Sequence, residues 1–146
     1  MTRRRMRSRP SWWLALLEAA VVMPWVALAL RLRGYAGTVR WAAGSSPGRP
    51  APHAGAPPPV PVLVVTSAVT VVAGRRPRGT CLPRAVTILW MTRRRGHHVE
   101  LFMGVSEPIG GTLPAHAWVE YGGQPLNDTA DVRERYQVLP LPPTGH

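Results

Sequence analysis

Residues 115–128 read AHAWVEYGGQPLND, and this stretch predicts a β-hairpin. A strand places alternate side chains on opposite faces. One face then carries His116, Trp118 and Glu120, and the other carries Ala117, Val119 and Tyr121. The pair Gly122-Gly123 is typical of the tight turn between two antiparallel strands, so we expect residues 124–128 to return as the next strand.

The length of this turn decides which polar residue faces His116. A two-residue turn pairs Trp118 with Asn127 and places Asn127 on the histidine face. A three-residue turn that includes Gln124 pairs Trp118 with Asp128, which then lies diagonal to His116. The residues leave both registers open, and either side chain supplies an oxygen that can orient a histidine base.

Upstream, residues 81–95 form the best-defined predicted helix. Thr80 is a suitable cap, and Pro83 falls in the first turn, where its missing N–H is harmless. Apolar residues recur at helical spacing, and arginines precede Gly96 at the end. The alternating segment 99–105 predicts a strand, and the Pro/Gly-rich segment 106–114 predicts a loop.

Cys81 would begin that helix, where free N–H groups and the helix dipole favour a thiolate. A histidine base completes the activation of such a nucleophile, and His116 is the natural candidate. Cys81 is the only cysteine in the chain. An internal disulfide and a multi-cysteine zinc site are therefore excluded, and a reducing compartment is favoured. The histidines lack metal-site spacing, so we expect no metal.

The N-terminal region, residues 1–43, begins with MTRRRMRSRP, and residues 12–30 are apolar except for Glu18. A signal peptide is disfavoured by the length of the apolar run and the absence of a cleavage site. A transmembrane span is disfavoured by Glu18 and Pro24. We prefer two buried or interfacial helices, the first capped by Ser11 and the second beginning or kinking at Pro24.

Residues 44–61, GSSPGRPAPHAGAPPPVP, predict an extended, mobile linker with an exposed His53. A domain at residues 62–146 follows. Its first segment, residues 62–73, is ambiguous, because its valines favour a strand whereas their spacing fits a helical face.

The net charge is +11, and every basic residue is arginine. Such a charge suits an acidic partner, an anionic membrane or nucleic acid. No zinc-finger or RNA-binding signature is present, so we expect no nucleic-acid partner and attribute most arginines to a solvated surface. The basic, apolar N-terminus predicts peripheral membrane contact at most.

The runs TCLPRA, MTRRRG, FMGV and HAWVEYGGQPLND resemble the standalone leader peptidase of lasso peptide biosynthesis, a transglutaminase-like cysteine protease. The resemblance covers roughly residues 75–139. It implies a small α+β, papain-like domain with a cysteine at a helix N-terminus, packed on an antiparallel sheet and preceded by N-terminal helices. It implies that residues 62–73 are helical. It also implies a triad of Cys81, His116 and Asp128.

The implied activity is removal of the leader from a ribosomally made precursor peptide, without a cofactor, in the cytoplasm. The implied partners are that leader, a separate leader-recognition protein and an asparagine synthetase-like cyclase. A separate recognition protein is expected because residues 1–61 do not resemble the winged-helix domain of fused versions. Trp118 is expected either to bind substrate or to pack in the core.

Two alternatives remain at this stage. The same triad can pass an acyl group to an amine, as transglutaminases do. The chain can also be a non-catalytic scaffold that binds peptide or membrane, in which case Cys81 is a small buried hydrophobic residue.

Overall fold

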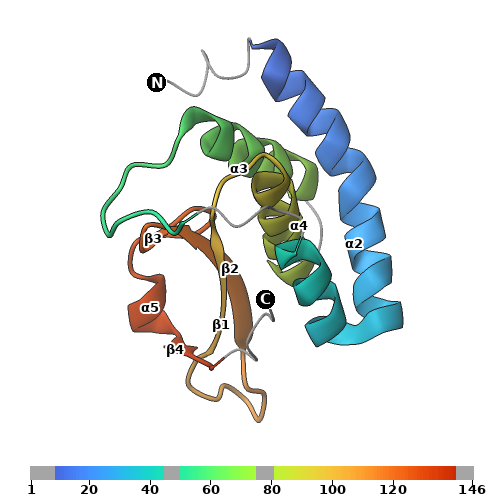
Figure 1. The fold of residues 1–146 in the computed structure, drawn as a ribbon. Helices are drawn as coiled ribbons and strands as arrows, with labels where there is room; N and C mark the ends of the chain where they lie inside the picture. The colour runs from blue at the N-terminus through green and yellow to red at the C-terminus, as the bar shows by residue number, and fades with distance from the viewer. Residues whose placement is uncertain (1–8, 45–49, 75–80, 141–146) are drawn as a thin grey trace.

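The structure, a computed structural model, describes residues 9–44, 50–74 and 81–140. It combines helices with one four-stranded antiparallel sheet in the order β3-β2-β1-β4 (Figure 1). The elements are α2 (Pro10–Ala43), α3 (Val60–Ala73), α4 (Cys81–Arg94), β1 (Glu100–Val105), β2 (Ala115–Tyr121), β3 (Gln124–Pro125), α5 (Val132–Arg135) and β4 (Gln137–Val138). This arrangement confirms the expected α+β class.

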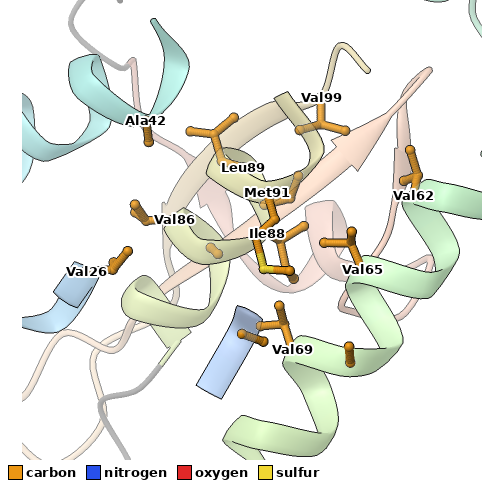
Figure 2. Close-up of a cluster of buried hydrophobic side chains, with 14 of the residues drawn as sticks. Val26, Ala42, Val62, Val65, Val69, Val86, Ile88, Leu89, Met91 and Val99 are labelled. Atoms are coloured by element: carbon orange, nitrogen blue, oxygen red, sulfur yellow. The ribbon is translucent and has the colours of Figure 1, made fainter. Parts of the chain in front are cut away.

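The core lies between the long helices and the sheet. α4 packs on β2 and on both α2 and α3, whereas α5 lies on the far side of the sheet (Figure 1). Figure 2 shows how side chains from three helices meet around α4. They include Val26 of α2, Val65 and Val69 of α3, and Ile88 and Met91 of α4, all fully buried. α4 is thereby held in the middle of the fold, with its first residue at the sheet.

α3 is helical although it is rich in valine. Val62, Val65 and Val69 lie on one helical face and are completely buried. A valine costs a helix at most about 0.7 kcal/mol relative to alanine. Its burial contributes about 1.5 kcal/mol or more, so packing outweighs propensity. The helical interpretation of residues 62–73 is therefore confirmed.

The N-terminal helices differ from the expectation in detail. α2 begins with Pro10 in its first turn, and Arg9, not Ser11, is the N-cap residue. The helix continues through Pro24 and is interrupted at Gly34, whose φ of 73° and ψ of 179° are not helical. Glycine tolerates this conformation without steric cost, so the break lies ten residues after the predicted one.

The described part of the predicted linker is docked on the hairpin. The Gly55 N–H donates to the Gly122 carbonyl across 2.9 Å, and Ala56 is buried. A Cβ on Gly122 would lie 3.1 Å from the His53 carbonyl oxygen. Residues 53–56 thus contact the hairpin, a contact that the predicted linker did not include, and the His53 side chain is exposed as predicted.

The central predictions for α4 and the strands are confirmed. α4 spans Cys81–Arg94, and Gly96 follows it with a φ of 83°. β2 has the predicted bounds, and β1 begins one residue later than expected. The proposed Thr80 cap lies outside the described residues. β3 is much shorter than the predicted strand at 124–128, and this difference shapes the site.

Candidate active site

α4 delivers Cys81 to β2, where the half-buried thiol meets the His116 imidazole. The hydrogen bond with His116 lowers the pKa of the Cys81 thiol. Burial opposes this effect, and the backbone N–H groups of Ala117 and Leu82 reinforce it. The thiolate form is therefore favoured by a histidine partner and by backbone donors, at a helix N-terminus that also stabilises negative charge.

His116 lies between a thiol and a carboxylate. Its Nε2 contacts Oδ2 of Asp128, which leaves Nδ1 as the nitrogen available to Cys81. The contact with Cys81 raises the pKa of the imidazole, burial opposes the rise, and Asp128 adds to it. The ring thus has acceptors on both sides, and both favour its charged form.

Asp128 is itself held by two residues besides His116. The Thr129 backbone N–H donates to its Oδ1 across 2.7 Å, and Nη2 of Arg135 donates to the same atom across 2.6 Å. Burial alone would raise the pKa of Asp128, but these hydrogen bonds and His116 lower it below its ordinary value. The carboxylate therefore stays ionised, with Oδ2 directed at His116.

The hairpin explains how Asp128 reaches the histidine. Tyr121 pairs with Gln124, so the turn holds two residues, Gly122 and Gly123, with φ of 57° and 83°. That register was expected to bring Asn127 to His116, and the structure corrects this.

β3 ends at Pro125, and Oδ1 of Asn127 accepts the Val119 N–H across 2.9 Å. The amide side chain occupies the position that a strand carbonyl would take. The chain then leaves the sheet at Asn127, and the next residue, Asp128, reaches His116. The strand had to end early for a two-residue turn to place Asp128 there.

Aromatic rings pack around the histidine. The centroid of the His116 ring lies 5.9 Å from that of the Trp118 ring and 5.0 Å from that of the Tyr136 ring. Trp118 is completely buried, stacks on Phe102 and donates its Nε1–H to Glu120 across 2.9 Å. Trp118 therefore packs behind the site and does not line a surface open to substrate.

Two arginines near the C-terminus, neither of which was predicted as a site residue, complete the surroundings of the site. Arg133 makes a bidentate pair with the buried Glu120, at 2.9 and 2.8 Å, and lies over the Phe102 ring. Arg135 holds Asp128. Both stand on α5, which has only four residues. The signal in the sequence that could have indicated them is their spacing of two residues, soon after Asp128.

A cleft of 570 Å³ opens beside Tyr136, between the loop after β1 and the α5–β4 segment. Glu107, Glu134 and Leu113 are among its lining residues. Tyr136, one of the lining residues, also contacts the His116 ring, so the cleft and the site share this residue. In the part of the chain that the structure describes, no group of three histidine, cysteine, aspartate or glutamate residues could hold a metal ion.

Comparison with protein families agrees with this geometry. The family model of the transglutaminase-like superfamily matches residues 14–140, which include all the contacts described above. Curated proteins and solved structures give no significant match. Since the matched segment covers most of the chain, from α2 to the end of the sheet, this protein belongs to the transglutaminase-like superfamily.

Proposed function

We propose that this protein is a cysteine peptidase that removes the leader from a ribosomally made lasso precursor peptide. The observation that carries the proposal is the continuous contact from Cys81 through His116 to Asp128, with the thiol at the N-terminus of α4. The superfamily contains cysteine peptidases and acyltransferases. The lasso assignment is supported by the resemblance of the cysteine, strand and hairpin motifs.

In the proposed reaction, the Cys81 thiolate attacks the carbonyl carbon of the last leader residue. The imidazolium of His116 then gives its proton to the leaving amine, which is the N-terminus of the core peptide. A water molecule attacks the thioester, with His116 as the base, and the leader departs with a free carboxylate. Asp128 keeps the imidazole oriented through both steps.

The oxyanion of each tetrahedral intermediate needs hydrogen-bond donors. The first N–H groups of a helix have no carbonyl partner within the helix. The backbone N–H of Cys81 is in this position and is the donor that we assign to the oxyanion. The cleft beside Tyr136 is the proposed path of the peptide towards Cys81.

The proposed partners are the leader peptide, a separate leader-recognition protein and an asparagine synthetase-like cyclase that closes the ring on the new N-terminus. The reaction is placed in the cytoplasm, because a reducing compartment keeps a lone reactive thiol reduced. No cofactor is needed for this chemistry.

The test is leader release from the precursor, in the presence of the recognition protein, followed by mass spectrometry. Wild-type protein should release leader and core as two products. Cys81→Ala should release neither, and His116→Ala should be nearly inactive. Release by Cys81→Ala at the wild-type rate would show that this thiol is not the nucleophile.

The same assay separates hydrolysis from acyl transfer. With a primary amine in excess, a hydrolase gives only the free leader carboxylate, whereas a transglutaminase-like acyltransferase gives an amine adduct. Failure of Cys81 to react with an alkylating reagent at neutral pH would instead favour a non-catalytic scaffold.

A further inference from the structure

α2 has two apolar faces on opposite sides. The inner face packs against α3 and α4 and buries Trp12, Ala15, Ala19, Met23 and Val26. The outer face leaves large apolar side chains exposed, namely Trp13, Leu14, Leu17, Val21, Trp25, Leu28 and Leu32, which we call the outer stripe. Figure 1 shows α2 at the outside of the fold, with no other element over that side.

The outer stripe is continuous. From Leu14 to Leu32 its members recur every three or four residues, which keeps them on one side of a helix for about 27 Å. Trp25 is 65% exposed and Leu32 is 76% exposed. Isolated apolar residues are common on soluble proteins, but a continuous stripe of this size marks a surface that binds something apolar.

α2 is long and apolar enough to cross a membrane by length and composition. Its inner face argues against a crossing, because those side chains form part of the core. Glu18 adds a second restraint, since it pairs with Arg95 of the neighbouring segment at 2.6 Å. A helix that spans the membrane would lose both the core packing of its inner face and the Glu18–Arg95 pair. Contact through the outer stripe, with the helix parallel to the bilayer, breaks neither.

Charge identifies the surface that the stripe fits. Arg9 lies at the start of α2, and Arg31 and Arg33 lie at the end of the stripe. The whole chain has a net charge of +11, and five of its first ten residues are arginine. A second copy of this chain carries the same charge and is repelled, whereas an anionic lipid surface is attracted.

We propose that the outer stripe of α2 binds an anionic membrane surface, with its tryptophans and leucines in the headgroup region and its arginines on the phosphates. α5 and the proposed peptide cleft then stay in water, because they lie across the sheet from α2 (Figure 1). The peptidase would act at the membrane without crossing it.

The test is co-sedimentation of the full chain with vesicles. Wild type should bind vesicles of mixed phosphatidylglycerol and phosphatidylcholine, and bind phosphatidylcholine alone much more weakly. The triple variant Leu17→Gln, Val21→Gln, Trp25→Gln should bind anionic vesicles about tenfold more weakly or worse. A matched control, Ile109→Gln with Leu113→Gln, changes exposed apolar residues of the loop after β1 and should bind as wild type does.

A charge variant tests the second half of the proposal. Arg31→Gln with Arg33→Gln should weaken binding to anionic vesicles and leave the folded state intact by circular dichroism. Equal binding of wild type and the triple variant would overturn the proposal. So would a wild-type dimer that the triple variant converts to a monomer without a change in vesicle binding. Protein that only detergent releases would contradict the peripheral arrangement.

Discussion

Nη2 of Arg135 lies 2.6 Å from Oδ1 of Asp128, the carboxylate oxygen that does not face His116. The guanidinium and the imidazole therefore hold the same carboxylate from two sides. The proposed reaction needs His116 in one orientation. Arg135 is therefore a positioning residue, which acts on His116 through Asp128 and not through the thiol.

We expect Arg135→Gln to lower kcat severalfold while KM changes little, since the loss affects orientation of the base and not substrate binding. Arg135→Lys should recover part of the rate, because it restores the charge without the planar fork. Arg94→Gln, which removes an exposed arginine that pairs with Glu18, is the matched control and should retain wild-type kcat. A rise in KM alone would assign Arg135 to substrate binding.

Asn127 and Asp128 are neighbours with separate expected roles. Asn127→Ala removes the acceptor of the Val119 N–H, so unfolding in urea should show a loss of about 1–2 kcal/mol. Its kcat should stay within about threefold of wild type. Asp128→Ala should lower kcat by about a hundredfold or more. The kcat of Asp128→Asn should lie between that of Asp128→Ala and that of wild type, because asparagine retains an acceptor. Equal loss of kcat in both alanine variants would contradict the separation.

The pair of Glu120 and Arg133 anchors α5 to β2. Glu120 is 2% exposed, so Arg133→Ala leaves a buried carboxylate without its cation. Breaking a fully buried pair costs about 3–5 kcal/mol, but the guanidinium is half exposed, so we expect about 2 kcal/mol. The measurement is the urea midpoint. In a double-mutant cycle with Glu120→Gln, the second change should cost much less than the first, whereas additive losses would mean that the two side chains are not coupled.

Gly104 lies opposite His116 in the β1–β2 ladder, and its missing side chain leaves room for Tyr136 and Trp118. A Cβ there would lie 2.8 Å from Cβ of Tyr136 and 3.2 Å from Cη2 of Trp118. Gly104→Ala should therefore displace β4, lower the thermal midpoint and reduce kcat. Gly37→Ala, where the added Cβ meets only ordinary contact at 3.5 Å, should be neutral or slightly stabilising. An unchanged kcat in Gly104→Ala would show that the aromatic packing does not hold the histidine.

The individual helices and strands could be predicted well from the sequence, whereas the contacts between them could be predicted less well. α4 and β2 could be predicted because their periodicity, glycines and terminal arginines all agree. The partner of His116 could not be derived from the hairpin alone. That partner depends on the register of the hairpin and also on the residue at which β3 ends. β3 ends early because the Asn127 side-chain amide, and not a backbone carbonyl, accepts the Val119 N–H.

Other features were hidden because they depend on tertiary contacts. Arg133 and Arg135 read as surface charges until α5 brings them to Glu120 and Asp128. The break at Gly34 was missed because Pro24, the stronger helix breaker by propensity, is tolerated inside α2. The sequence contained no indication that Trp118 is completely buried, since its strand face also carries the partly exposed His116.

The pH dependence of Cys81 reactivity follows from its contact with His116. That contact lowers the pKa of the thiol and raises the pKa of the imidazole. Alkylation by iodoacetamide should therefore begin below the ordinary thiol pKa of about 8.5. Peptidase activity should also fall on the alkaline side, above the ordinary imidazole pKa of about 6.5, once His116 loses the proton that it gives to the leaving amine.

The stability that the pair provides should follow the same two shifts. The raised pKa of His116 stabilises the fold below the pKa of the unfolded imidazole, and this contribution is lost as pH rises through the folded value. The lowered pKa of Cys81 stabilises the fold above the unfolded thiol pKa, and this contribution is lost as pH falls through the folded value.

His116→Ala tests this coupling directly. Without the imidazole, burial dominates, so alkylation at pH 7 should slow about tenfold or more and its pH profile should move towards that of an ordinary thiol. Arg94→Gln, a change at an exposed arginine at the end of α4, is the control and should leave the profile unchanged. Because the chain contains a single cysteine, each adduct seen by mass spectrometry reports Cys81 alone. An alkylation profile that His116→Ala leaves unchanged would mean that the thiolate owes its stability to the helix N-terminus and not to the histidine.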